Sequence, residues 1–316
     1  MKNSTRALIG FVAWLAFVAS ARTWPSGEAW THVLLTFAAL ILVPLALDLV
    51  TERRDSGQIA RTMSWASTLQ LPAAACLALA CGLQPGLVAL ALALPWATVT
   101  ALLASVGLAR LARDTWARPI DRLSADVGMG YLVIGGVWLL VDRAGLHPLR
   151  FAAPVVALTA VHFHTAGFLL PLFAGRVARA NSDSRLAARG VVGVILGVPA
   201  VALGITLSQL GWTSAVEAAA GCGLALAAAI VAVLHIRWAL DRADQEPAAR
   251  GLIFVCGVCL FFAMVLAACY AVRPYMAALP WLGLPQMRAI HGTLNAIGVG
   301  ASGVVGWRFV EQKRPI

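Results

Sequence analysis

The chain has 316 residues, of which 60% are hydrophobic and only 12% are charged. Soluble globular domains are nearer half apolar and a quarter charged, so this composition excludes an ordinary soluble protein and predicts a polytopic membrane protein. The formal net charge of +10 does not indicate a nucleic-acid partner, because the 24 Lys and Arg residues are distributed between apolar runs and form no single basic patch.

The first apolar segment allows two interpretations. Lys2 and Arg6, the apolar stretch that follows them and the small residues Ala19-Ser20-Ala21 together resemble a cleavable signal peptide. We expect this segment to be retained as a first helix, because its loss would leave an odd number of helices and one terminus on each side of the membrane.

Ten apolar runs of roughly 15 to 25 residues, the length that crosses about 30 Å of hydrocarbon, follow one another along the chain. They cover residues 7–21, 30–50, 63–82, 86–109, 124–142, 150–175, 190–208, 215–236, 251–272 and 286–307. The connecting loops are short, which leaves no room for a soluble domain between the helices. The sequence therefore predicts an all-α transmembrane helical bundle in a single domain, residues 1–316.

The basic residues predict the orientation of the bundle. With both termini in the cytoplasm, 19 of the Lys and Arg residues lie on the cytoplasmic side and five lie outside: Arg22, Arg143, Arg150, Arg273 and Arg288. Positive residues are retained on the cytoplasmic side of a membrane, so this asymmetry predicts a multi-pass protein of the cytoplasmic (inner) membrane. All six cysteines fall inside apolar runs, where we expect them to be buried free thiols.

The run at 150–175 contains the segment VHFHTAGF, with His162 and His164 roughly 18 to 21 Å along the expected helix. Ionisable groups at this depth are costly and usually face the interior of a bundle or a wet cavity. Two residues that are two positions apart point about 200° from each other, so both imidazoles bind one ion only if the helix unwinds. The alternative is that both histidines form hydrogen bonds with Ser, Thr or backbone groups.

Three further polar residues lie in later runs. Glu217 is near the outer end of its helix, where the positive end of the helix dipole stabilises a carboxylate. If Glu217 is buried instead, it becomes a neutral acid able to donate a proton. His291 and Asn295 share one helix face, roughly 8 and 14 Å deep. Beside them runs a stripe of small residues that favours close helix packing: Gly292, Ala296 and Gly300.

We expect one cavity, with Glu217, His291 and Asn295 in the outer half of the membrane and His162 or His164 beneath them. The alternative is that each forms hydrogen bonds that join two helices. The remaining ionisable residues of the apolar runs lie close to an interface, where solvation accounts for them: Asp48, Asp126 and His235 at the cytoplasmic ends, and His32 and His147 near the outer surface.

The same segments carry a resemblance to a known family. The chain resembles the YndJ-like family of bacterial membrane proteins in three stretches: Val161-His162-Phe163-His164 with Ala166-Gly167-Phe168 and Pro171, His291-Gly292 with Leu294-Asn295-Ala296 and Gly298, and Leu42-Val43-Pro44-Leu45. The resemblance implies a bundle that spans most of the ten helices. It implies no particular biochemical activity.

A weaker resemblance is to the main subunit of haem-copper oxidases, in which a His-Phe-His helix and a His-Gly segment supply haem ligands. It implies that His162 or His164 with His291 could hold one haem or one metal ion. That subunit needs more histidines for its copper centre and second haem than this sequence has at membrane depth.

These residues favour a membrane-embedded enzyme that moves protons on a lipophilic substrate, by cyclisation, isomerisation or epoxide opening. The expected catalytic residues are His162, His164, Glu217, His291 and Asn295, with no cofactor. Three alternatives stay open. One is a redox or sensor protein that binds haem or a metal ion through His162, His164 and His291, another is a small-molecule transporter, and the last is an assembly role without chemistry.

Overall fold

The computed structural model describes residues 1–21, 25, 27–114, 118–276 and 278–312. Every regular element in these ranges is helical, which confirms the all-α prediction. Three basic residues used in the orientation prediction, Arg22, Lys313 and Arg314, lie outside the described residues.

Nine helices in the described ranges are long and apolar enough to cross a membrane. They are α1 (Asn3–Ala21), α2-η1-α3 (Trp30–Val50), α4 (Gly57–Cys81), α5 (Leu87–Asp114), α6 (Ile120–Arg143), α7-η4-α8 (Ala153–Ala180), α9 (Arg185–Gln209), α10 (Ser214–Asp241) and α11 with the short η5 (Pro247–Tyr275). A tenth helical segment follows as α12 (Leu284–Gln286), η6 (Met287–Gly292), η7 (Leu294–Ala301) and α13 (Ser302–Gln312). It is less apolar because it contains His291, Asn295 and several glycines.

Most helices extend a few residues beyond the apolar runs, since a helix continues into the polar interface. The sixth is an exception, because it starts at Ala153 and not at Arg150. Leu149 and Arg150 have φ angles of 53° and 61°, which a right-handed helix does not allow, and Pro154 then occupies the first helical turn. His162 therefore lies about 14 Å along this helix, less deep than the sequence predicted.

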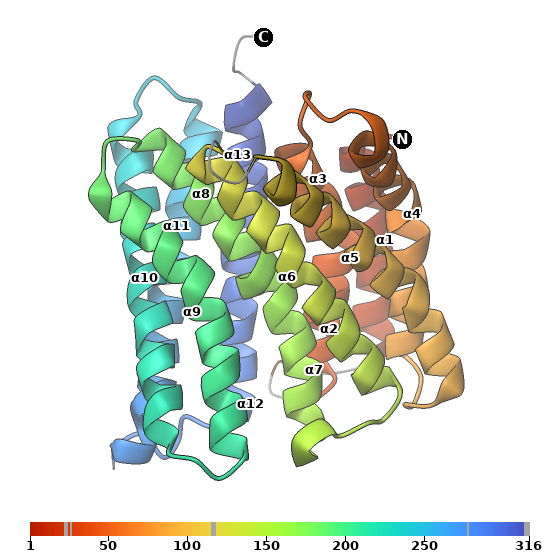
Figure 1. Ribbon diagram of the computed structural model, residues 1–316. Helices are drawn as coiled ribbons and strands as arrows, with labels where there is room; N and C mark the ends of the chain where they lie inside the picture. Colours follow the sequence, from red (N-terminus) through yellow and green to blue (C-terminus); the bar gives the residue numbers. More distant parts are fainter. Residues whose placement is uncertain (22–24, 26, 115–117, 277, 313–316) are drawn as a thin grey trace. The chain divides into compact units, whose positions relative to one another are not determined.

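The chain divides into two compact units, residues Met1–Leu169 and Leu170–Ile316. In the first unit α5 packs along both α4 and α6, and α2 packs against α1, α4 and α7. In the second unit α10 packs along α9 and α11, and α11 also contacts η7 and α13. Figure 1 shows the long helices of each unit running side by side. A single transmembrane domain remains a prediction.

One close helix approach in the first unit depends on glycine. A Cβ atom added at Gly107 of α5 would lie 2.4 Å from the carbonyl oxygen of Asp126 on α6. No side chain fits at that distance, so the absence of a side chain at Gly107 lets the backbones of α5 and α6 meet.

Two of the nine spans and the tenth helical segment contain π-helical segments, and in the two spans a proline follows shortly afterwards. Pro44 has no N–H group, so the turn of η1 before it lacks one backbone donor. The carbonyl of Ala39 in η1 instead accepts a hydrogen bond of 2.8 Å from Nε2 of Gln70, a buried residue of α4. Pro171 stands just after η4 in the same way. Such segments occur often at functional sites.

Candidate functional site

His164 is buried in the core of the first unit, and both of its ring nitrogens form hydrogen bonds. Nε1 of Trp96 on α5 donates to Nε2 of His164 over 2.9 Å, and Nδ1 of His164 lies 2.8 Å from the carbonyl oxygen of Ala160. A carbonyl only accepts and an indole N–H only donates, so the imidazole is neutral and carries its proton on Nδ1. This geometry favours a packing role for His164.

The α6 helix makes room for this ring. A Cβ atom at Gly135 would lie 2.8 Å from Nδ1 of His164, so any larger residue at this position would clash with the imidazole ring. The ring also stacks on Trp96 with 5.9 Å between the centroids. The position of His164 is therefore fixed by three helices of one unit.

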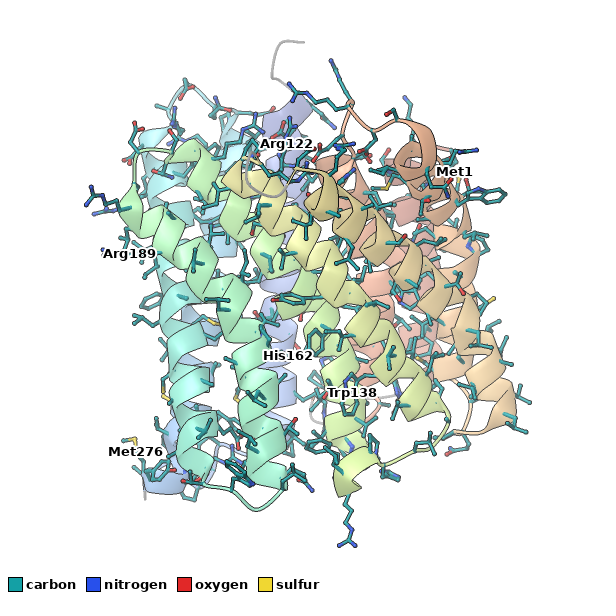
Figure 2. All side chains as sticks on the ribbon, viewed as in Figure 1. Met1, Arg122, Trp138, His162, Arg189 and Met276 are labelled. Atoms are coloured by element: carbon teal, nitrogen blue, oxygen red, sulfur yellow. The ribbon has the colours of Figure 1, made fainter. Side chains whose placement is uncertain are left out.

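His162 has a different environment, although it is only two residues away. Its side chain is exposed, whereas the residues that follow it in η4 are buried. Figure 2 shows His162 at a level between Arg122, close to one end of α6, and Trp138, closer to the other end. An exposed imidazole at this depth cannot reach an interface and needs a polar environment. His162 is thus the member of the pair that a ligand could reach.

His291 and Asn295 lie together in the second unit, one turn apart. Nδ1 of His291 is 2.9 Å from the carbonyl oxygen of Ala263 on α11, and Nδ2 of Asn295 donates to the carbonyl of His291 over 2.8 Å. Both side chains are half-buried. The bond to Ala263 places the proton of neutral His291 on Nδ1, so Nε2 carries the lone pair.

The glycine-rich face of the same segment packs closely on its neighbours. Ala296 and Gly300 of the expected small-residue stripe are buried. A Cβ atom at Gly303 would lie 2.8 Å from the ring of Phe173, and one at Gly306 would lie 2.8 Å from Ile253. The close contacts thus continue to the end of this helix, beyond the predicted stripe.

Glu217 lies in the first turn of α10 and is half-buried. The helix is capped by Thr213, whose Oγ1 accepts a hydrogen bond from the backbone N–H of Ala215. The Cα atom of Glu217 packs against Gly204 of α9. Within the described part of the chain its carboxyl group forms no hydrogen bond or ion pair with another residue. A position at the positive helix end accounts for a carboxylate here.

The structure therefore joins His291 to Asn295 and places His162 and His164 in one helical segment of the other unit. A single cavity that contains all five residues remains a prediction. Among the described residues, no group of three or more His, Cys, Asp or Glu side chains is arranged to hold a metal ion.

Sequence reasoning missed an ion-pair network at the predicted cytoplasmic end of the first unit. Asp126 was expected to be solvated, but it is completely buried between Arg110 and Arg118. Arg110 lies 3.1 Å from Oδ1 of both Asp126 and Asp55, and Arg118 lies 2.5 Å from Oε1 of Glu52. The charged side chains at this end of the unit thus pair with each other. The signal available in the sequence was that basic and acidic side chains occur together in these segments.

His235 was also expected to be solvated, and it is completely buried in the second unit. Its Nδ1 lies 2.8 Å from the carbonyl oxygen of Val231, and Nε1 of Trp307 donates to its Nε2 over 3.2 Å. The two units therefore each contain a buried histidine held between an indole N–H and the carbonyl four residues before it. No local sequence pattern connects His235 with a tryptophan 72 residues later.

A third polar cluster lies at the opposite end of the first unit. Nε2 of His32 on α2 is 3.1 Å from Oδ2 of Asp142 and 3.0 Å from Nη2 of Arg143, both at the end of α6. Arg143 is buried and donates from Nη1 to the carbonyl oxygens of Ala80 and Leu83, each over 3.1 Å. An arginine that the sequence assigned to an outer loop thus caps the end of α4.

Apolar helices, buried hydrogen-bonded histidines and ion pairs near helix ends define a polytopic α-helical membrane protein. A model of the YndJ-like proteins matches residues 33–299. The chain belongs to the YndJ-like family, which confirms the resemblance in the sequence, and it is a multi-pass integral protein of a bacterial membrane.

A similar protein is the uncharacterized membrane protein YndJ of Bacillus subtilis (strain 168), with 31% identity over 222 residues. The match covers 70% of this chain but only 39% of the Bacillus protein, so the chain spans well under two thirds of that relative. No solved structure matches the chain.

Proposed function

We propose that this protein is a membrane-embedded enzyme that acts on a lipophilic substrate by acid/base proton transfer. The proposal is carried by the geometry of His291. Because its Nδ1–H group donates to the carbonyl of Ala263, its Nε2 atom is the basic atom of a fixed tautomer inside the tenth helical segment. A base held in one tautomer at membrane depth can take a proton from a substrate that reaches it from the lipid.

Asn295 and His162 are further candidate residues of the proposal. The amide nitrogen of Asn295 donates to the carbonyl of His291, one turn earlier, and this bond fixes the orientation of the amide group. The Oδ1 atom of Asn295 can then position a substrate hydroxyl or polarised C–H group. His162, the exposed imidazole of the first unit, is a separate candidate proton carrier. Glu217 is a candidate acid near the end of α10. We assign His164 to packing, because Trp96 and Ala160 engage both of its nitrogens.

The reaction class is a cyclisation, an isomerisation or an epoxide opening. In an isomerisation the base removes a proton from one carbon and a proton is returned to another, so the formula of the substrate is unchanged. In an acid-initiated cyclisation a proton is added to an alkene or epoxide and a second proton is lost at the end. Both sequences exchange a substrate proton with solvent, and no oxidant or reductant is consumed.

This exchange supplies a test that does not require the substrate to be known. The full chain in lipid nanodiscs is incubated in D2O with a total lipid extract of the source bacterium, and lipids are analysed by mass spectrometry after back-exchange of O–H and N–H groups. A parallel reaction in H2-18O detects epoxide opening by water. We expect at least one lipid to gain a stable label.

The variants identify the base. Removal of a general acid or base typically lowers a rate by about 10²- to 10⁴-fold, so His291→Gln and His162→Gln should each nearly abolish labelling. His147→Gln is the matched control, because His147 lies in a loop and bonds only to the carbonyl of Phe151 among the described residues. Labelling equal to wild type in His291→Gln, or no label in any lipid, would refute the proposal. A Soret band in the purified protein would favour the haem alternative instead.

A further inference from the structure

The cluster around His32 contains two contacts that require opposite protonation states of one atom. A guanidinium group only donates hydrogen bonds, so the 3.0 Å contact with Nη2 of Arg143 requires a lone pair on Nε2 of His32. A carboxylate only accepts, so the 3.1 Å contact with Oδ2 of Asp142 requires a proton on the same nitrogen. The imidazole therefore has a partner within reach in either state.

The two partners are fixed by their own contacts. Oδ2 of Asp142 lies 2.7 Å from Nη2 and 2.8 Å from Nε of Arg143, so the two charges are paired. The other end of the guanidinium is held by the carbonyls of Ala80 and Leu83 at the end of α4. Both side chains are almost fully buried, whereas the side chain of His32 is 18% exposed and can exchange a proton with water.

Few other charges can act on this imidazole. The exposed Glu28 lies four residues before His32, in the turn that precedes α2. Cys81 of α4 interacts electrostatically with Asp142 and Arg143. Of the other elements packed on α2, η1 has no ionisable side chain, α1 has only Arg6 and α7 has only His162. The Asp142–Arg143 pair is thus the main charged neighbour of His32 in the described part of the chain.

We propose that His32 is a proton-binding site, and that proton uptake transfers its Nε2 hydrogen bond from Arg143 to Asp142. In the neutral state Nε2 accepts from Arg143, and the guanidinium remains on the carbonyls of α4. In the protonated state Nε2 donates to Asp142, and two cations then stand next to each other. Their repulsion weakens the hold of Arg143 on Ala80 and Leu83, so the end of α4 loosens. Histidine is the side chain suited to such a change between about pH 5 and 8.

The first test observes the proton itself. The full chain is labelled with 15N-histidine, placed in nanodiscs and studied by NMR at about pH 8 and about pH 5, the limits of the usual histidine range. The signal of His32 is identified by its loss in His32→Gln. We expect Nε2 to be unprotonated at the higher pH and protonated at the lower pH. A proton on Nε2 at both values, or on neither, would overturn the proposal.

The second test measures the end of α4. After correction for the intrinsic pH dependence, amide hydrogen exchange of residues 80–87 should be several-fold faster at about pH 5 than at about pH 8 in the wild type. His32→Gln, which cannot be protonated, should abolish this difference, and the control His147→Gln should retain it. An equal pH effect in wild type and His32→Gln would refute the coupling. Neither test depends on the proposed enzymatic activity.

Discussion

The hydrogen bond between Trp96 and His164 provides the sharpest test of the packing described here. Trp96→Phe removes the indole donor and leaves Nε2 of His164 buried without a donor. An orphaned buried acceptor costs about 1–3 kcal/mol. Measured hydrogen bonds between membrane helices average about 0.6 kcal/mol, with a maximum of about 1.7. The two ranges overlap, and we expect the free energy of unfolding to fall by about 1–2 kcal/mol.

The assay is unfolding in mixed detergent micelles, followed by far-UV circular dichroism. A double-mutant cycle of Trp96→Phe and His164→Leu isolates the hydrogen bond from the loss of ring volume, and its coupling energy should be about 0.6–1.7 kcal/mol. Trp65→Phe is the control, because Trp65 is exposed and should tolerate the change. A coupling energy indistinguishable from zero would refute the assignment of His164 to packing through Trp96.

Three further changes should alter stability in the same assay. Asp126→Asn removes the carboxylate that pairs with buried Arg110, and we expect a loss of about 3–5 kcal/mol. Gly107→Ala places a methyl group 2.4 Å from the carbonyl oxygen of Asp126, so α5 and α6 must separate at a cost of about 1–3 kcal/mol. Ser184→Ala removes the side-chain acceptor for the N–H of Ala187 at the start of α9, with an expected loss of about 1 kcal/mol.

Each change has a matched control, which is the same type of substitution at a more exposed or less crowded position. Asp114→Asn alters a carboxylate whose ion pairs are partly exposed to solvent, and it should have little effect. A Cβ atom at Gly130 would meet only Leu108, at 4.0 Å, so Gly130→Ala should be tolerated. Ser182→Ala changes an exposed serine two residues before the cap. If a control destabilises the protein as much as its partner, the structural reason given for that partner is wrong.

The helices could be predicted because lipid imposes their length and polarity. A segment such as 30–50 must be apolar over about 20 residues to cross the hydrocarbon, so the composition alone marks it. The start of the sixth helix was wrong by three residues, since the positive φ angles at Leu149 and Arg150 leave no trace in hydropathy.

The polar contacts could not be predicted in the same way. Trp96 and His164 are 68 residues apart, and nothing in either segment encodes their register across α5 and η4. Asp126 stands near a helix end, where solvation and burial in an ion network are equally compatible with the sequence. The contact of His291 with Ala263 likewise depends on how α11 and η6 pack. Helix position is a local property, whereas the partner of a buried polar group is set by tertiary packing.

The boundary between the two units has a practical consequence for dissecting the molecule. It falls at Leu169, inside the continuous helix Ala153–Ala180, and not in a loop. Cutting the gene at the loop before this helix would deprive the N-terminal fragment of α7 and η4, and cutting after it would deprive the C-terminal fragment of α8. Co-expressed halves should therefore reassemble poorly, whichever of the two loops is cut. Each unit needs part of the helix Ala153–Ala180, so the two units share this helix when the chain is inserted into the membrane.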